Sequence, residues 1–389
     1  MSSLIGPSSF SRRRRKSLGL CLAVALGLAG TGLVAAPRAL AQTAKAAGAQ
    51  TPSGSEFDSP SGLAFGAGNL WVTNLDGNSV TEIDPSSGAW LNTFSGSSYD
   101  FDQPTAILSV GADLFVTNAG GSVTELQASN GSAVRVISGS QFDFSDPVAI
   151  AASGATVIVL SAGDPSADPA VRASITEIDA ITGDLVLTES ASKYGFDDPM
   201  ALTVTGGDLF VANNGNNSVT EANIATGTLV RILTTSIGSP DGIAAGDGHV
   251  WVVDSQDPQC CSSDGAVTEI EATTGAVLGV FDNGTYGFND PGVAIEPGSS
   301  VFIASPYGSS PMITKVSPKK VAKTGNATWY VCNTNGPYYF SNVSALAVSD
   351  KDLWVASATG ANNPNSAAAT GSLTELSTKN AALITTLPS

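Results

Sequence analysis

Aspartates recur beside proline in the segments that separate strand-rich parts of the chain, and they are the residues best suited to bind a cation. Residues 99–104 (YDFDQP) are typical of these segments. Carboxylate oxygens that converge on one point bind hard cations, so these acids predict a Ca²⁺ or Mg²⁺ site. The alternative is that each carboxylate bonds the backbone of its own turn. The candidate ligands are Asp102, Asp146, Asp198, Asp241 and Asp290.

Three cysteines, Cys260, Cys261 and Cys332, lie outside the N-terminal leader described below. Three thiols in an exported chain predict one disulfide and one remaining thiol. A bridge from Cys260 or Cys261 to Cys332 would join two long loops, and a strained bridge between the adjacent Cys260 and Cys261 is the alternative. A zinc site is not expected, because zinc would need a histidine partner and the chain has only one histidine.

Aromatic side chains are concentrated around residues 307–340. Flat rings with a polar edge suit a sugar or a peptide ligand. They suit a small apolar cluster beneath a loop equally well. The candidate binding residues are Tyr307, Trp329, Tyr330, Tyr338 and Tyr339.

The only histidine, His249, follows a short glycine-rich turn. The chain offers no Ser-His-Asp set, Cys-His pair, H-E-x-x-H motif or phosphate-binding glycine loop. No catalytic residue is therefore assigned, and whether the chain is an enzyme stays open, with a non-catalytic role favoured.

One phrase, Ser-Val-Thr-Glu-Ile or a variant of it, recurs seven times and sets the fold. Copies of a strand-rich, glycine-punctuated unit 43 to 60 residues apart are typical of a β-propeller. The sequence therefore predicts an all-β, seven-bladed propeller of four-stranded antiparallel blades. The anchor residues are Val80, Val123, Ile175, Val219, Val267, Ile313 and Leu373.

The first copy defines the expected blade. Four short β-rich runs, at residues 59–65, 70–74, 79–84 and 89–94, are separated by glycine, proline and asparagine turns. Four such runs joined by tight turns predict an antiparallel meander. The second run of every copy is apolar on both faces, as expected for a sheet packed between two others.

The same order of strands and turns predicts that the loops lie on two opposite faces of the ring. The loops after each second strand and the segments between blades share one face, and all the long insertions fall there. That face also receives the linker aspartates, at the mouth of the central channel. Variable loops on a rigid ring are a usual place for binding, although neutral loop drift would give the same pattern. The insertions are residues 162–173, 256–265, 306–311, 317–342 and 358–371.

A glutamate occupies one position in six of the seven copies. Strand alternation places it between blades, where a partly buried carboxylate needs a partner such as a serine, a threonine or a backbone amide of the next blade. A catalytic acid is needed once, so six copies predict a structural role. The glutamates are Glu82, Glu125, Glu177, Glu221, Glu269 and Glu375, and Lys315 replaces the glutamate in the sixth copy.

Residues 57–389, with motifs such as LWVTN and NSVTEIDPSSG, resemble the extracellular YVTN, NHL and virginiamycin-lyase-like propellers. The resemblance implies the propeller fold, and members of these groups include binding scaffolds as well as lyases and lactonases. The lyases use a histidine base beside a metal. His249 is expected on the face opposite the long loops, so a histidine-dependent lyase is not supported.

The N-terminus reads as an export signal. Residues 12–16 (RRRRK) are basic, residues 18–36 are apolar and residues 39–41 (ALA) form a cleavage site before Gln42. A twin-arginine signal and a plain basic region both fit. We expect a signal peptide at 1–41, a flexible linker at 42–56, no membrane span after cleavage, and a secreted or cell-envelope location.

The net charge of the chain limits the classes of partner that it can bind. Six of the 17 basic residues and none of the 34 acidic ones lie in residues 1–41, so 11 basic residues remain and the net charge is −23. Such a chain repels nucleic acid and anionic membranes. We expect a monomeric, non-catalytic scaffold that binds an extracellular protein or glycan through the long-loop face. A divalent-metal lactonase or lyase and a purely structural envelope component are the alternatives.

Overall fold

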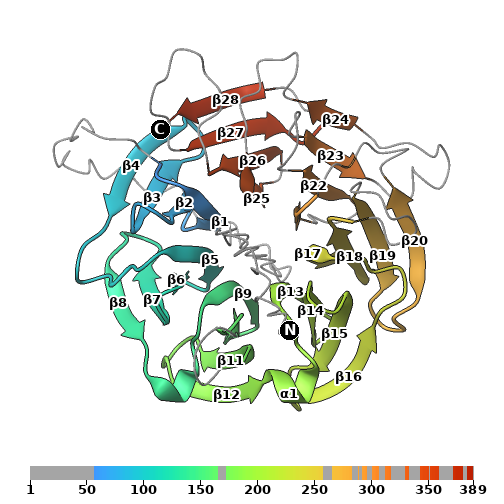
Figure 1. The fold of residues 1–389 in the computed structure, drawn as a ribbon. Coiled ribbons are helices and arrows are strands. Elements are labelled where there is room, and N and C mark those ends of the chain that lie inside the picture. The colour runs from blue at the N-terminus through green and yellow to red at the C-terminus, as the bar shows by residue number, and fades with distance from the viewer. Residues whose placement is uncertain are drawn as a thin grey trace, which may run out of the picture.

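The protein is a seven-bladed β-propeller in a computed structural model. The structure describes residues 57–164, 172–256, 265–282, 288, 291–295, 300–305, 312–316, 329–332, 342–349, 351–358, 371–379 and 383–388. Seven four-stranded antiparallel sheets surround a central axis (Figure 1). The predicted fold class is confirmed.

Each blade consists of four strands that are consecutive in the chain. Blade 1 contains β1 (Pro60–Gly66), β2 (Asn69–Asn74), β3 (Ser79–Asp84) and β4 (Ala89–Phe94). Blade 2 contains β5 (Pro104–Val110), β6 (Asp113–Asn118), β7 (Ser122–Gln127) and β8 (Ala133–Ile137). Blade 3 contains β9 (Pro147–Ser153), β10 (Thr156–Ser161), β11 (Ser174–Asp179) and β12 (Leu185–Ser190). Blade 4 contains β13 (Pro199–Thr205), β14 (Asp208–Asn213), β15 (Ser218–Asn223) and β16 (Thr228–Leu233).

The remaining blades follow the same order. Blade 5 contains β17 (Pro240–Gly246), β18 (His249–Asp254), β19 (Ala266–Glu271) and β20 (Val277–Asp282). Blade 6 contains β21 (Val293–Ile295), β22 (Val301–Ser305), β23 (Met312–Val316) and β24 (Trp329–Cys332). Blade 7 contains β25 (Val343–Val348), β26 (Asp352–Ser357), β27 (Ser372–Ser377) and β28 (Leu383–Pro388). Two short helices, η1 (Ser140–Phe142) and α1 (Ala191–Tyr194), precede blades 3 and 4.

The second strand of each blade is the core of the fold. In β2, the side chains of Leu70, Trp71 and Val72 are fully buried although they point to alternating faces. Both faces are covered because each blade packs between two neighbours, as the apolar runs predicted. The outermost strands are more exposed. In β16, for example, the side chains of Leu229, Val230 and Ile232 are exposed to solvent.

Among the described strands, none is exchanged between the two ends of the ring. Blade 7 packs directly on blade 1, and the first and last strands of the chain belong to separate sheets (Figure 1). Phe57, Leu63 and Leu70 share one buried apolar cluster with Ala345 and Trp354. The hydroxyl of Ser344 in β25 also donates a hydrogen bond to the carbonyl of Pro60 in β1. Apolar packing and one inner-strand hydrogen bond therefore hold this closure.

The segments between blades share one backbone design. An apolar side chain, such as Phe57 or Phe196, is buried three residues before the inner strand. The last residue before that strand has a left-handed backbone, and its carbonyl accepts a hydrogen bond from the loop after the second strand of the same blade. The linkers and these loops therefore form one face, as predicted. The left-handed residues are Ser59, Gln103, Asp146, Asp198, Ser239 and Asn342.

Among the described residues, no helix is both long and apolar enough to cross a lipid bilayer. The predicted signal peptide at 1–41 and linker at 42–56 lie outside the described residues, so both stay predictions.

Candidate functional site

The five predicted metal ligands do not occupy equivalent positions. Asp146 and Asp198 are the left-handed residues just before the inner strand, with φ of 55° and 50°. Asp102 lies one position earlier in its linker, and Asp241 lies two positions later, inside β17. Asp290 is outside the described residues. The linkers therefore repeat their backbone, while the carboxylates attached to it are staggered.

Asp146 and Asp198 have a clear backbone role. Aspartate tolerates the left-handed region better than most residues. The carbonyl of Asp146 accepts from Ala162 N at 2.9 Å, and that of Asp198 accepts from Asn214 N at 3.0 Å. These hydrogen bonds are made by backbone carbonyls and not by the carboxylates, so binding to a cation and binding to the turn both stay predictions.

Two further linker acids lie over the loop of their own blade. A Cβ atom added to Gly120 would lie 2.1 Å from Asp102 Oδ2, and one added to Gly215 would lie 2.7 Å from Asp197 Oδ1. Each loop needs glycine because the carboxylate occupies that space. Both aspartates are nevertheless exposed on the outside of the face.

Asparagine side chains tie each loop to the next blade. Asn78 Oδ1 accepts from Gln103 N at 2.6 Å, and Asn217 Oδ1 accepts from Ser239 N at 2.9 Å. Asn214 Nδ2 donates to Asp241 Oδ1 at 2.7 Å, again from blade 4 to blade 5. The loops and linkers of the described blades therefore form a connected surface, which we call the loop face.

The loop face is acidic and several of its acids are exposed, among them Asp100, Asp102, Asp143, Asp197 and Asp198. Across the described part of the chain, no three His, Cys, Asp or Glu side chains come together as a metal-binding group. The predicted Ca²⁺ or Mg²⁺ site is therefore not assembled from the described acids alone, and metal binding stays a prediction.

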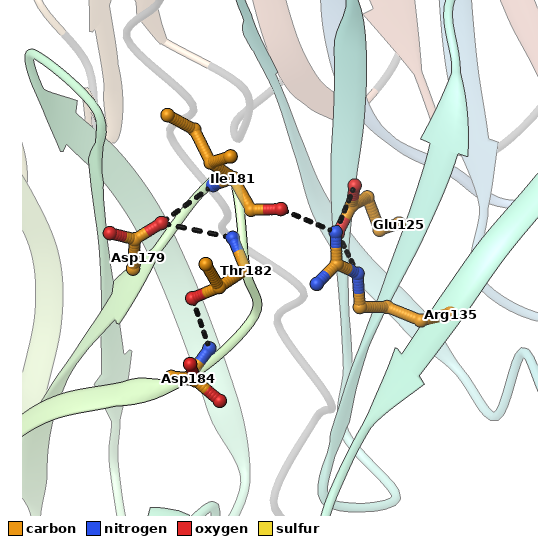
Figure 2. Close-up of polar contacts among 6 residues, drawn as sticks. All are labelled: Glu125, Arg135, Asp179, Ile181, Thr182 and Asp184. Atoms are coloured by element: carbon orange, nitrogen blue, oxygen red, sulfur yellow. Dashed lines mark hydrogen bonds and ion pairs between the residues drawn. The ribbon is translucent and has the colours of Figure 1, made fainter.

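Two acids on the opposite face, which we call the turn face, are hydrogen-bonded within their own turns. Asp84 accepts hydrogen bonds from the Ser86 hydroxyl and the Ser87 hydroxyl, both at 2.7 Å, which lower the pKa of its carboxyl. Asp179 accepts from Thr182 N at 3.0 Å and Ile181 N at 2.8 Å, with the same effect on its pKa (Figure 2). These carboxylates hold the turn before the fourth strand.

The predicted aromatic and cysteine sites fall largely outside the described residues. Tyr307, Tyr338, Tyr339, Cys260 and Cys261 are not described. The structure places Trp329, Tyr330 and Cys332 on β24, the outermost strand of blade 6. Their proposed roles in binding and in a disulfide stay predictions.

Two of the repeated glutamates are neutralised by arginines that sequence reasoning missed. Glu125, on β7, is buried and pairs with Arg135 of β8, with 2.7 Å between Arg135 Nε and Glu125 Oε2 (Figure 2). Arg231 of β16 pairs with Glu221 at 2.9 Å in the same way. The predicted partner, a hydroxyl or amide of the next blade, is wrong for these two residues. The sequence signal was an arginine ten positions after the glutamate in both copies.

Each arginine also joins its blade to the next one. Arg135 Nη2 donates to the Ile181 carbonyl in blade 3 at 2.8 Å (Figure 2), and Arg231 Nη2 donates to the Thr273 carbonyl in blade 5 at 3.0 Å. Lys315, which replaces the glutamate in blade 6, donates to the Thr378 carbonyl in blade 7 at 2.9 Å. Three inter-blade junctions therefore share one kind of contact, a cation on a turn carbonyl.

The other glutamates have different surroundings. Glu82 accepts from Asn69 Nδ2 at 2.6 Å, and Glu269 lies 2.9 Å from His249 Nδ1. Burial raises the pKa of both carboxyls, and their partners oppose that rise. The single histidine therefore pairs with one of the repeated glutamates, on the side of the ring away from the loop face.

Comparisons agree with the propeller. The computationally designed Ika8 protein matches with a TM-score of 0.57 at 16% identity, covering 86% of this chain and 88% of that one. BamB from Moraxella catarrhalis gives a TM-score of 0.50 at 17% identity, with 78% and 84% covered. The Pan2 WD40 domain of Neurospora crassa gives 0.56 at 12% identity, with 77% and 86% covered. These identities establish the fold alone.

No curated protein sequence matches the chain significantly. The family model for the outer membrane protein assembly factor BamB matches residues 38–279, which is more than half of the chain. The resemblance to propeller families in general is thus confirmed, whereas the narrower YVTN and NHL resemblance stays a prediction. The chain belongs to the family of the outer membrane protein assembly factor BamB.

Proposed function

We propose that this chain is a non-catalytic, protein-binding scaffold that works outside the cytoplasm and binds its partner through the loop face. Membership of the BamB family supports an assembly or scaffold role over catalysis. The predicted export signal at 1–41 supports the location. The scaffold acts as a monomer with respect to its own chain.

The observation that carries this proposal is the group of exposed acids on the connected loop face. Asp84 and Asp179 on the turn face are engaged in hydrogen bonds of their own turns. Asp102, Asp197 and Asp198 on the loop face are exposed and rest on a connected backbone surface. Exposed carboxylates on a rigid ring favour a partner with a complementary basic surface, and they speed its association.

Other ligands are compatible with the same face. A glycan would use the aromatic side chains of residues 307–340, and a Ca²⁺ or Mg²⁺ ion would use the linker acids. A metal-dependent lactonase or lyase needs that ion, so the enzyme hypothesis depends on the metal. A protein partner needs only the surface already described.

In-cell photo-crosslinking tests the proposal. A photo-reactive amino acid is placed at Asp102 or Asp197 on the loop face, and at the exposed Ala112 or Ala225 on the turn face. We expect discrete protein adducts from the loop-face positions and far fewer from the turn-face positions. Equal adducts from both faces, or none from the loop face while the fold is retained, would overturn the proposal.

A further inference from the structure

An aspartate and a glutamate in blade 7 repeat a pair in blades 2 and 4 whose glutamate binds an arginine. In these three blades the second strand begins with an aspartate, namely Asp113, Asp208 or Asp352. A buried glutamate lies on the adjacent third strand in each case. The residue that pairs with this glutamate on the fourth strand is Arg135 in blade 2, Arg231 in blade 4 and Thr385 in blade 7.

The two filled copies show what this position holds. Arg135 reaches Glu125 through Nε at 2.7 Å and Nη2 at 3.2 Å, and Nη2 also donates to a carbonyl of the next blade. Arg231 reaches Glu221 at 2.9 and 3.2 Å with the same onward contact. A planar group with several N–H donors makes these contacts together, which an ammonium ion cannot do with the same geometry.

Blade 7 has the acids without the arginine. The side chain of Glu375 is buried, with 6% of its surface exposed. Within the described residues, no hydrogen bond or ion pair involves its carboxylate. Burial, with a smaller contribution from Asp352, raises the pKa of Glu375 to about 7. A buried carboxylate in this state gains from a cation that can reach it.

The lysines near blade 7 do not neutralise the pair. Lys315 donates to the Thr378 carbonyl and lies over the Phe302 ring. Lys351 and Lys379 are exposed at the turns, and no ion pair within the described residues joins either to Glu375.

The position is reachable from solvent on the side where a cation enters. Arg135 and Arg231 keep 30% and 28% of their side-chain surface exposed, whereas the glutamates they bind keep 2% and 1%. The carboxylate thus lies at the inner end of a site whose outer end opens at the rim. In blade 7 the equivalent position lies on β28, the outermost strand, where Ile384 is half exposed.

Blade 3 supplies a contrast within the same chain. Glu177 also lacks a cation on the fourth strand, but it pairs in register with Leu187 and its second strand begins with Thr156. Leu187 packs near Gly227 of the next blade, so an apolar side chain fills the place of the arginine. Only blade 7 among the described blades combines both acids with an uncharged residue at this position of the fourth strand.

We propose that Asp352 and Glu375 form a vacant arginine position that binds the guanidinium group of an arginine from a partner protein. The site lies on the rim of blade 7, away from the loop face, so it holds whether or not the loop face binds. A partner with an arginine on an exposed edge would insert that side chain along β28. It would then complete the contact that Arg135 and Arg231 make from within the chain.

Carbon-13 NMR of the glutamate side-chain carboxyls tests the site with ethylguanidinium as the probe. The Glu375 signal is assigned with Glu375→Gln, and its titration midpoint is followed at constant ionic strength. We expect ethylguanidinium to lower this midpoint by about 1 pH unit, the shift that a nearby opposite charge produces. Ethylammonium should lower it less, and Glu177 should not respond to either.

A filled-site variant provides the decisive control. Thr385→Arg should lower the Glu375 midpoint without any probe and abolish the response to ethylguanidinium. An unchanged Glu375 midpoint with ethylguanidinium, or a full response that survives in Thr385→Arg, would overturn the proposal. The affinities of a capped Gly-Arg-Gly peptide and of free arginine are compared, to distinguish an arginine within a protein from the free amino acid. Tighter binding of free arginine would contradict a partner-protein arginine.

Discussion

Replacing Glu375 by glutamine should make the protein more stable at neutral pH and should remove part of its pH dependence. The carboxyl of Glu375 has a pKa of about 7 in the folded chain, against a reference value of 4.5. A group with a raised folded pKa contributes stability that is complete below its unfolded pKa and is lost as pH rises through its folded pKa. Glu375 therefore costs stability progressively from about pH 4.5 to about pH 7.

The size of the effect follows from the shift. One pKa unit corresponds to about 1.4 kcal/mol, so a shift from 4.5 to about 7 corresponds to about 3 kcal/mol. Relative to the parent protein, Glu375→Gln should gain up to about 3 kcal/mol between pH 4.5 and pH 8. Glutamine keeps the shape and the hydrogen-bonding ability of the protonated acid, so little else changes.

Urea unfolding at several pH values measures this difference. The other buried glutamates also titrate, so the informative quantity is the parent-to-variant difference at each pH. Asp84→Asn is a control of opposite sign, because hydrogen bonds lower the pKa of Asp84 and its stabilisation is lost as pH falls. A Glu375→Gln difference that is constant from pH 4.5 to pH 8 would refute the reasoning.

Three further changes test the packing between blades. Arg135→Met should destabilise the protein by about 2 kcal/mol, because it leaves buried Glu125 unpaired. This is less than the cost of breaking a fully buried pair, because Arg135 is 30% exposed. In denaturant unfolding, the double variant Glu125→Gln/Arg135→Met should recover stability relative to Arg135→Met. Gly120→Ala should displace the Asp102 side chain and cost about 1 kcal/mol of stability. A Cβ atom at Gly68 meets no atom within 4 Å, so Gly68→Ala tests the left-handed backbone alone. Melting curves of the two variants separate the steric cost from the backbone cost. Phe57→Ala should cost about 3–5 kcal/mol of stability and loosen the packing between blades 7 and 1. Hydrogen exchange should then be faster in β1 and β25 than in β13. Uniform exchange across the ring would contradict this role of Phe57.

Much of the fold was predictable because each repeat encodes its strands locally. The expected third and fourth strands of blade 1, at residues 79–84 and 89–94, match β3 and β4. The first is shifted by one residue from β1, and the second is one residue shorter than β2. Alternation, turn residues and apolar second strands decide these elements. The way the ring closes is not predictable from the repeats, because closure depends on contacts between residues almost 300 positions apart, such as Ser344 and Pro60.

The site was less predictable because its geometry arises between blades. The linker motif suggested equivalent acids, but Asp102, Asp198 and Asp241 occupy three different positions relative to the inner strand. The glutamate partners were wrongly sought in the next blade. Arg135 lies opposite Glu125 only after a register shift in the β7–β8 pair, which the sequence does not reveal.

The most direct test of the scaffold proposal is the affinity of the crosslinked partner for two charge-matched variants. Asp197→Asn/Asp198→Asn removes two exposed charges from the loop face, and Asp184→Asn/Asp247→Asn removes two exposed charges from the turn face. Two exposed ion pairs contribute about 1–2 kcal/mol, so the loop-face variant should bind about tenfold more weakly at low salt, while the turn-face variant should bind like the parent. Equal affinity of the two variants, with both folded, would contradict binding through the loop face.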